Sequence, residues 1–341
     1  MSESLVFSYN TPDPVRGVRL VSDPTPTNYF LVLHGKYPVK PRNTIAVAGG
    51  EDCPIPGSDG AARIVQTGSA VTQFQVGDIV VLRTHCQGSW RTHAVLDESD
   101  VLRVPSTLDP RLACILRMSV APAYFLLRDY HSLEPGDWII QNAATSAVSH
   151  FISQLALLQG IHVISLIRNR HSEEERERMK RSLRSHGASI VLTTDELATT
   201  GSEILRGKRI SLALDFVSDD ALARQVASFL VPGATLVTAG FLGVSSGTTD
   251  GSLQQFLWQR NITLKAFRLS DCLGRRSLFH QMALLEWFAR LFMGRTLKAP
   301  ALEYVRWKRG DEGLERELQG VLERHEAGGV GERKKILVFD A

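Results

Sequence analysis

The spacing of apolar and polar residues differs between the first third of the chain and the remainder. Residues 1–130 contain short β-rich runs, such as 61–65 and 78–82, separated by turn-forming residues. From Pro135 onward, short apolar runs alternate with stretches in which apolar residues recur at helical spacing. The first part is therefore predicted to be β-rich and the second part to be α/β.

The alternation after Pro135 is regular. A buried strand at 138–141 is followed by a helix at 148–158, which Gly160 ends. Further strands are predicted at 162–167, 190–192, 210–216 and 234–239, with helices at 172–185 and 221–230 between them. Strands that alternate with helices form a parallel sheet covered by helices. An amphipathic helix at 277–293 and a strand at 335–339 are expected near the end of the chain.

Length and charge narrow the class of protein. The chain has 341 residues, which corresponds to about two domains at roughly 100–200 residues each. Hydrophobic residues make up 43% and charged residues 22%, a balance that excludes a disordered or collagen-like chain. The formal net charge is only +3, so no direct nucleic-acid partner is expected, because phosphate neutralisation needs a stronger basic bias.

The four cysteines, Cys53, Cys86, Cys114 and Cys272, are scattered and form no cluster with ligand spacing. We therefore expect no bound metal, no disulfide framework and a reducing compartment. No stretch reaches ~18 uncharged apolar residues, so no membrane span is expected. The first residues, MSESLVFSYNTPDP, have neither an apolar signal core nor the Arg-rich pattern of a presequence.

The turn after strand 138–141 is a candidate phosphate loop. It runs Asn142-Ala-Ala-Thr-Ser-Ala-Val-Ser149 and stands where dinucleotide-binding folds place a glycine-rich loop. Small Ala and Ser side chains still permit a close approach to the backbone, and the Thr145 and Ser146 hydroxyls are potential donors to a pyrophosphate. A plain strand–turn–helix accounts for the same residues, and this alternative stays open.

The strand at 162–167 is followed by Arg168-Asn-Arg170. An acidic residue at this position would bind the ribose 2′-hydroxyl of NAD, whereas a guanidinium suits the additional 2′-phosphate of NADP. Surface arginines at the end of a strand would look the same in the sequence. Together the turn and the arginines favour NADPH more than either does alone.

Several motifs occur in an order and spacing that resemble a known family. They are Gly35-Lys-Tyr-Pro38, Gly88-Ser-Trp-Arg91, Leu133-Glu-Pro-Gly-Asp-Trp-Ile-Ile-Gln-Asn-Ala143, Thr145-Ser-Ala-Val-Ser149 and Arg168-Asn-Arg170. The chain resembles the mitochondrial trans-2-enoyl-thioester reductases, zinc-free members of the medium-chain dehydrogenase/reductase superfamily. The resemblance implies an α/β fold with a GroES-like catalytic domain at 1–128, completed by 271–341. It places a doubly wound Rossmann domain at 129–270.

The resemblance also implies a reaction. NADPH would reduce a trans-2-enoyl thioester of CoA or acyl-carrier protein to the saturated thioester in mitochondrial fatty acid synthesis. The active-site tyrosine of the family corresponds to Tyr37, whose phenol suits the thioester oxygen or a proton transfer. A homodimer in the mitochondrial matrix is implied, with Ile262–Lys265 and the segment near Gly240–Gly251 as edge elements.

The cofactor positions of the family are carried over residue by residue. They correspond to Ser119, Thr145, Ser146, Ala147, Val148, Arg168, Asn169, Arg170, Ala239, Gly240, Phe241, Leu242, Phe267, Arg268, Leu269, Ser270 and Lys334, the last being Lys335 if the register shifts by one.

Several positions depart from the family pattern. Residues 26–31 differ from its Asn-Pro-Ser-Asp-Ile-Asn segment, and Pro122 replaces a threonine, which removes a hydroxyl and a backbone N–H. Ser218-Asp219 replaces Gly-Gly, and Arg268 replaces a pocket tryptophan. Three hypotheses therefore remain: an active reductase of enoyl thioesters, a quinone-reductase-like enzyme acting on another conjugated carbonyl, and an inactive relative. The last would serve as a structural or assembly subunit of a mitochondrial complex such as the mitoribosome.

Overall fold

The computed structural model describes residues 2–7, 18–23, 29–33, 57–68, 71–85, 87–169, 172–240, 252–307, 313, 316, 320 and 334–339. The chain forms two compact units. Unit 1 contains Met1–Met118 and Leu273–Ala341, and unit 2 contains Ser119–Cys272. The sequence prediction placed the beginning of the second domain at residue 129. In the structure, helix α2 (Ala121–Arg128) packs on helix α3 (Ala147–Leu158) and so lies with unit 2.

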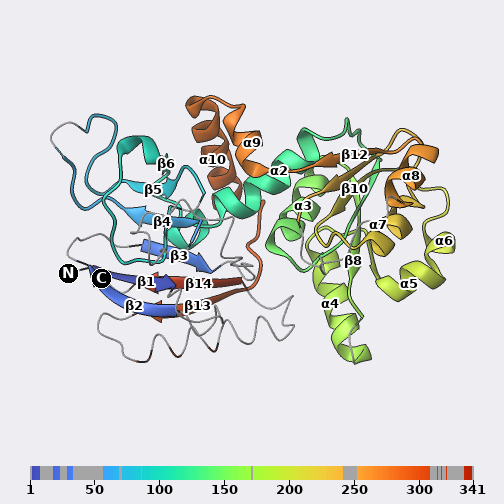
Figure 1. Ribbon diagram of the computed structural model, residues 1–341, viewed down its shortest axis with the longest axis horizontal. Helices are drawn as coiled ribbons and strands as arrows, with labels where there is room; N and C mark the ends of the chain where they lie inside the picture. The colour runs from blue at the N-terminus through green and yellow to red at the C-terminus, as the bar shows by residue number, and fades with distance from the viewer. Residues whose placement is uncertain are drawn as a thin grey trace. The chain divides into compact units, whose positions relative to one another are not determined.

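The predicted parallel sheet is confirmed as the centre of unit 2 (Figure 1). Its strands lie in the order β12-β11-β10-β7-β8-β9, and every pair is parallel. Their bounds are β7 Trp138–Gln141, β8 His162–Ile167, β9 Ile190–Thr193, β10 Ile210–Asp215, β11 Thr235–Thr238 and β12 Thr263–Ala266. The order reverses between β7 and β10, which is the switch point of a doubly wound sheet.

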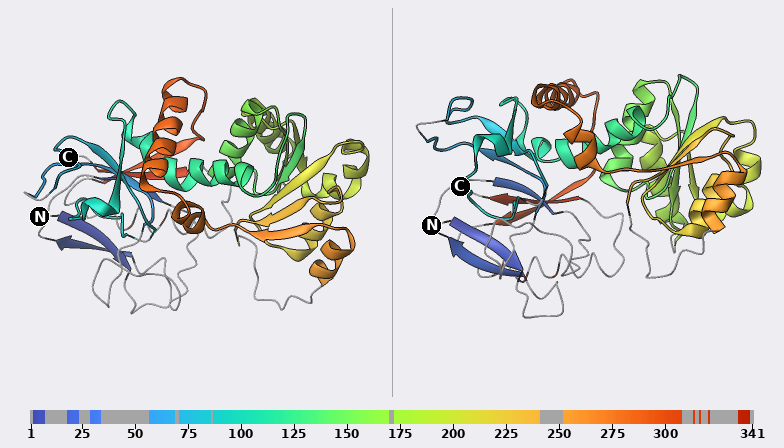
Figure 2. Two further views of the ribbon diagram at one scale, coloured as in Figure 1. Left: turned by 90° about the horizontal axis from the view of Figure 1, so that it is seen from above. Right: turned by 45° about the horizontal axis from the view of Figure 1, so that its top comes forward.

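Helices cover both faces of this sheet (Figure 2). Alternate residues of one strand point to opposite faces. Leu166 of β8 accordingly belongs to a core cluster with residues of α7 (Asp220–Ala227) and α8 (Ser252–Gln259). Its neighbour Ile167 packs with Leu183 of α4 (Glu173–Ser185) in a second cluster. The continuous apolar runs of the sequence are therefore strands buried on two sides.

Unit 1 is β-rich, as predicted for a GroES-like domain. Its larger sheet has the order β13-β14-β3-β4-β5-β6, and β1 pairs with β2 in a separate antiparallel sheet. The strands are β1 Ser2–Phe7, β2 Val18–Asp23, β3 Tyr29–Leu33, β4 Gly60–Arg63, β5 Ile79–Leu82, β6 Val101–Val104, β13 Leu302–Trp307 and β14 Lys334–Phe339. Strands from both ends of the chain thus meet in one sheet.

The predicted helices are confirmed with small shifts at their ends. Ser172 caps the charged helix α4 with its side chain, and three glutamates occupy the first turn, where the helix dipole favours negative charge. The predicted C-terminal helix is α10 (Leu278–Met293). The remaining helices are α1 Pro110–Ala113, α5 Thr194–Thr199, α6 Gly201–Ile204, α9 Leu269–Gly274 and a 3-10 turn at Glu98–Asp100.

Pro122 lies in the first turn of α2, directly after a π-helical turn at Leu116–Val120. The fixed φ of proline is compatible with the first turn of an α-helix. Among the described residues, one helical stretch, Pro110–Arg128, has the length and apolar composition of a membrane span. Because 72% of its most apolar window is buried inside the structure, the stretch also fits the core of a folded domain.

Candidate nucleotide site at the carboxyl edge of the parallel sheet

The turn after β7 leads into the N-terminus of α3 at the switch point of the sheet. Ala143 has a positive φ of 47°, and Ser146 caps the helix by accepting a hydrogen bond from the Ser149 amide at 3.2 Å. The next amides, those of Ala147 and Val148, belong to the first turn of α3, whose N–H groups have no partner within the helix. A helix N-terminus edged by small side chains is suited to an anion.

The two strands on either side of the switch point are joined by buried polar side chains. Asn142, directly after β7, donates from Nδ2 to Oδ1 of Asp215 at 2.6 Å. The Asn142 Oδ1 accepts from the Phe216 amide at 2.7 Å, and Asp215 Oδ1 also accepts from the amides of Val217 and Ser218. Asn142 and Asp215 are 4% and 5% exposed, so these hydrogen bonds are shielded from water.

The loop after β10 is joined in turn to the loop after β11. Ser218 donates from Oγ to the Gly240 carbonyl oxygen at 2.6 Å, and the Ala239 amide donates to the Asp215 carbonyl at 2.7 Å. A Cβ on Gly240 would lie 2.9 Å from the Phe216 carbonyl oxygen, so glycine permits the close approach. The predicted cofactor positions Ala239 and Gly240 thus lie in a loop with a fixed backbone.

Asp219 caps helix α7 by accepting a hydrogen bond from the Leu222 amide at 2.8 Å. Its carboxylate is exposed. This aspartate replaces a glycine of the family pattern, and its negative charge is directed to the N-terminus of a helix, where it stabilises the helix dipole.

The predicted 2′-phosphate segment follows β8. Arg168 and Asn169 are both exposed at this strand end, and Arg170 lies outside the described residues. The carboxyl ends of all strands in a parallel sheet lie at one edge. Arg168 and Asn169 therefore share that edge with Thr145, Ser146 and the other predicted residues that follow strand ends.

The segment after β12 contains four predicted cofactor positions. Phe267 is half-buried and packs against Tyr130, with ring centroids 5.8 Å apart. Leu269 is buried, whereas Arg268 is exposed and lies 4.0 Å from Asp271. Ser270 is exposed and donates to Asp271 at 3.3 Å.

The Tyr130 hydroxyl contacts both the end of β12 and Cys272. It donates to the Ala266 carbonyl at 3.3 Å and contacts the Cys272 sulfur at 3.7 Å. Burial, with a further contribution from Cys272, raises the pKa of Tyr130 well above its usual value. The phenol is therefore a hydrogen-bond donor that keeps its proton at neutral pH.

Two predicted cofactor residues do not follow a strand of the parallel sheet. Ser119 is fully buried in the π-helical turn before α2. Lys334 begins β14 in unit 1. Burial lowers the pKa of Lys334, while the nearby Asp59 and Cys114 act in the opposite direction. Tyr37, Phe241 and Leu242 lie outside the described residues.

The sequence interpretation did not assign a role to Asn142, Asp215 or the Ser218 hydroxyl. A signal was present, because Asn142 and Asp215 each stand at the end of a buried apolar strand, where ligands of open α/β sheets bind. Nothing in the local sequence indicates that two residues 73 positions apart form a hydrogen bond.

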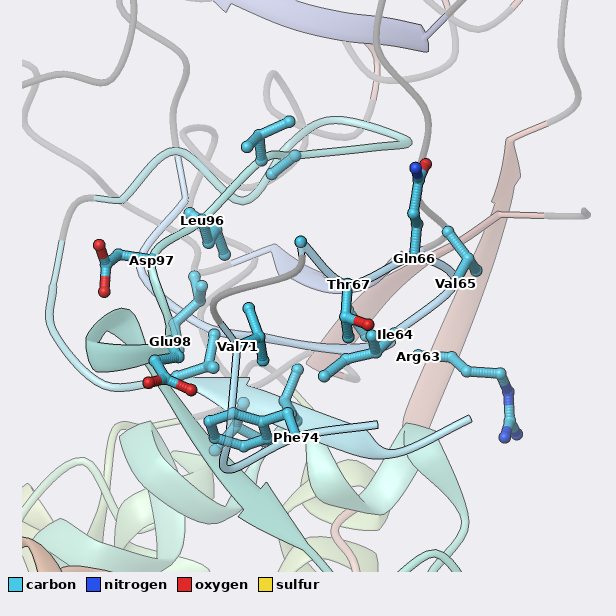
Figure 3. Close-up of a pocket in the computed structure, with 18 of the residues that line it drawn as sticks. Arg63, Ile64, Val65, Gln66, Thr67, Val71, Phe74, Leu96, Asp97 and Glu98 are labelled. Atoms are coloured by element: carbon cyan, nitrogen blue, oxygen red, sulfur yellow. The ribbon is translucent and has the colours of Figure 1, made fainter. Parts of the chain in front are cut away.

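The described residues contain no group of three or more His, Cys, Asp or Glu side chains arranged to hold a metal ion. A separate cavity of about 360 Å³ lies in unit 1, lined mainly by aliphatic side chains such as Ile64, Val71 and Leu96 (Figure 3). Glu98, also in its lining, accepts hydrogen bonds from two backbone amides of the neighbouring loop. None of the predicted cofactor residues lines this cavity.

The residues at the carboxyl edge of unit 2 fit a phosphorylated dinucleotide. The edge combines a helix N-terminus for a pyrophosphate, a guanidinium after β8 for a further phosphate, and a close backbone approach at Gly240. These features occupy the two halves of the sheet on either side of its switch point.

The chain is similar in sequence to known proteins. Residues 30–106 match the alcohol dehydrogenase GroES-like domain. The chain is 32% identical over 245 residues to the mitochondrial enoyl-acyl-carrier-protein reductase of Schizosaccharomyces pombe, which covers 68% of this chain and 65% of that protein. It is also 32% identical over 222 residues to the human mitochondrial enoyl-acyl-carrier-protein reductase, with 64% of this chain and 57% of that protein covered. The chain thus matches less than two thirds of the length of these relatives.

Solved structures share the fold over the full length. A complex of Etr1p with NADP and crotonyl-CoA has a TM-score of 0.78 at 22% identity, with 99% of both chains covered. A mitochondrial 2-enoyl thioester reductase Etr1p/Etr2p heterodimer from Candida tropicalis has a TM-score of 0.79 at 21% identity, again with 99% of both chains covered.

Proposed function

Because this chain is a relative of the mitochondrial enoyl-acyl-carrier-protein reductases, we propose that it is an NADPH-dependent reductase of trans-2-enoyl thioesters. The substrate would be a thioester of CoA or of acyl-carrier protein, and the product the saturated thioester. The observation that carries the proposal is the edge of unit 2, where Arg168, the N-terminus of α3 and Gly240 follow the ends of β8, β7 and β11.

The residues of this edge have distinct tasks in the proposal. The N–H groups of Ala147 and Val148, with the Thr145 and Ser146 side chains, would bind the pyrophosphate. Arg168 and Arg170 would bind the 2′-phosphate, and so select NADPH over NADH. Asn142 and Asp215 hold the ends of β7 and β10 at a fixed spacing beneath them.

Bound NADPH supplies a hydride to C3 of the enoyl thioester. Tyr37 would donate a hydrogen bond to the thioester carbonyl and stabilise the negative charge that develops on its oxygen. The same phenol is a suitable source of the proton that C2 receives. No covalent intermediate between protein and substrate is needed in this scheme.

The competing hypothesis, a non-enzymatic subunit of a mitochondrial complex, rested on the departures from the family pattern. Two of them have a local structural explanation that does not remove the nucleotide site. Pro122 lies in the first turn of α2, where the fixed φ of proline is tolerated, and the Asp219 carboxylate caps α7. Arg268 is exposed beside Asp271. The reductase is therefore the function we favour.

We further propose that the protein forms a homodimer in the mitochondrial matrix. Strand β12 is the last strand of the unit 2 sheet, and its four residues are exposed. On neighbouring helix α8, Trp258 is 81% exposed. An edge strand with exposed apolar neighbours is suited to pairing with a second copy of the same chain. Light scattering tests the oligomeric state: we expect the mass of a dimer, and the mass of a monomer would contradict the proposal.

Two assays on one preparation test the function. The first follows NADPH oxidation by absorbance with trans-2-hexenoyl-CoA, and the second follows NADPH binding by fluorescence. Binding with turnover supports the reductase. Binding without turnover supports the non-enzymatic subunit, and a folded protein that does not bind NADPH contradicts the nucleotide assignment.

A further inference from the structure

Three loops at the carboxyl edge of unit 2 are joined by side-chain hydrogen bonds. Asn142 bonds to Asp215, and Asp215 accepts from the Ser218 amide at 2.9 Å. Ser218 then bonds to the Gly240 carbonyl at 2.6 Å. The bonds therefore run from the end of β7 through the loop after β10 to the loop after β11.

These loops lie on a defined side of the proposed nucleotide. A doubly wound sheet binds one half of a dinucleotide over each set of three strands. Arg168 follows β8 and assigns the adenosine half, with its 2′-phosphate, to β7, β8 and β9. The nicotinamide half would then lie against the loops after β10 and β11, which Ser218 joins. This step rests on the proposed function.

Ser218 itself has an unusual conformation. Its φ is 57°, in the left-handed region that non-glycine residues rarely occupy. The Asp215 carboxylate holds its amide, and the Gly240 carbonyl holds its hydroxyl, so both polar groups maintain the conformation. A glycine at 218 would adopt the same φ without strain but would have no hydroxyl to bond Gly240.

The neighbouring backbone leaves little room for adjustment. Gly240 already approaches Phe216 so closely that a Cβ would lie 2.9 Å from the Phe216 carbonyl oxygen. The Ala239 amide also donates to the Asp215 carbonyl at 2.7 Å. The Ser218 hydroxyl bond therefore sets the direction in which the Gly240 carbonyl points.

We propose that Ser218 is a positioning residue for the nicotinamide end of the bound nucleotide, acting through the backbone of Gly240. Its hydrogen bonds go to Asp215 and Gly240, and neither of these is proposed to bind the 2′-phosphate or the pyrophosphate. Loss of its hydroxyl leaves the adenine end of the site unchanged. It makes the Gly240 backbone beside the nicotinamide ring less firmly held.

The test uses the full-length variants Ser218→Ala and Ser218→Gly. Ser228→Ala is the matched control, because the exposed Ser228 donates to the Gln225 carbonyl at the same 2.6 Å at the other end of α7. NADPH fluorescence reports the surroundings of the nicotinamide ring. Calorimetry with 2′,5′-ADP reports the adenine end alone. We expect both Ser218 variants to lose most of the fluorescence enhancement and to bind NADPH about tenfold more weakly, as for one lost hydrogen bond. Their affinity for 2′,5′-ADP should equal that of the wild type and of Ser228→Ala.

Each result is decisive. Wild-type fluorescence in both Ser218 variants overturns the positioning role while the reductase proposal stands. Equal weakening toward NADPH and 2′,5′-ADP also overturns it, because the effect would then be a general disturbance of the site. Ser218→Gly carries the test alone if Ser218→Ala does not fold, since glycine relieves the backbone strain. If the folded wild type binds neither nucleotide, the proposed function and this inference fail together.

Discussion

The side chains of Asn142 and Asp215 meet at 2.6 Å between Nδ2 and Oδ1, across the point where the strand order of the parallel sheet reverses. Both residues are buried; Asn142 carries an amide and Asp215 a carboxyl group. The amide supplies the donor that the carboxylate needs, and a buried polar group without its partner is costly. The spacing of the two central strand ends therefore depends on the hydrogen bond between these two side chains.

The first prediction concerns Asn142→Asp. Two carboxylates at this distance must share a proton, so the folded-state pKa of one rises above its unfolded value. A raised folded pKa stabilises the protein below the unfolded value near ~4, and that stability is lost as the pH rises through the folded pKa. We expect a loss of about 2–4 kcal/mol at pH 7 and a smaller loss at pH 5. Urea unfolding at both pH values measures it.

Asn261→Asp is the control for that variant, because it makes the same substitution at an exposed turn residue. A loss of stability in Asn142→Asp that did not change with pH would show that the two carboxylates are not close in the folded protein.

The inner strands of unit 2 were predictable because each contains a short apolar run between residues that end it. The predicted bounds of β7 and β8 agree with the structure at both ends. Helix α5 was not predicted, although Thr193 and Glu196 form a capping box that marks its start in the sequence. Its short polar sequence has too few apolar positions to show helical spacing.

The candidate site was predictable only in part, and for a physical reason. Residues that follow strand ends can be assigned to one edge of a parallel sheet once the alternation is recognised. The bond from Asn142 to Asp215 and the bond from Ser218 to Gly240 join segments that are distant in the sequence, and they depend on the tertiary fold. The resemblance to a family indicated positions but not these contacts.

The second prediction concerns nucleotide choice. Replacing Arg168 and Arg170 with alanine removes the guanidinium groups proposed to bind the 2′-phosphate. Each lost interaction is worth on the order of 1.5–3 kcal/mol, or roughly tenfold or more in affinity. We expect weaker NADPH binding and unchanged NADH binding by fluorescence titration. The double variant Arg178→Ala, Arg181→Ala on the exposed side of α4 is the control. An equal loss for both nucleotides would contradict the assignment.

The third prediction concerns His131, which contacts Thr235 at 3.1 Å through Nδ1. Burial lowers the pKa of His131, Lys265 and Arg209 lower it further, and Asp137 opposes them. A histidine with a lowered folded pKa favours the folded state while neutral. Stability is therefore full above the unfolded pKa near ~6.5 and falls as the pH drops below it. His131→Gln should show a smaller loss of stability than the wild type between pH 7.5 and 5 in urea unfolding.

His280→Gln, on the exposed start of α10, is the control for the histidine experiment. If His131→Gln and the wild type lose the same stability over this pH range, His131 does not carry the dependence.

The fourth prediction concerns the buried Lys180, whose Nζ lies 2.6 Å from Glu196 Oε1. Burial opposes ionisation of Glu196, but the hydrogen bonds from Lys180 and from the Thr193 amide lower its pKa overall. The contribution of the ionised Glu196 carboxylate to the free energy of unfolding is present above the unfolded pKa near ~4.5. It is lost as the pH falls through the folded pKa. Glu196→Gln should cost about 1–3 kcal/mol at pH 7 in urea unfolding. Glu177→Gln, which removes the more exposed partner of Lys180 at 3.3 Å, should cost under ~1 kcal/mol. Equal costs would show that burial of the pair is unimportant.

The last prediction concerns Tyr37, the proposed hydrogen-bond donor to the thioester carbonyl. Tyr37→Phe keeps the ring and removes the hydroxyl, so substrate and nucleotide binding should persist while the developing charge loses its donor. Removal of one such donor lowers kcat by about 10²-fold or more. We expect this loss in NADPH oxidation with trans-2-hexenoyl-CoA, with NADPH affinity within twofold of the wild type (about 0.4 kcal/mol).

Tyr304→Phe, at an exposed tyrosine of β13, is the control and should leave kcat unchanged. Full activity in Tyr37→Phe would mean that another group polarises the carbonyl. A weakened affinity for NADPH with unchanged kcat would move Tyr37 from the chemical step to nucleotide binding, because the hydroxyl would then act in the ground state and the transition state alike.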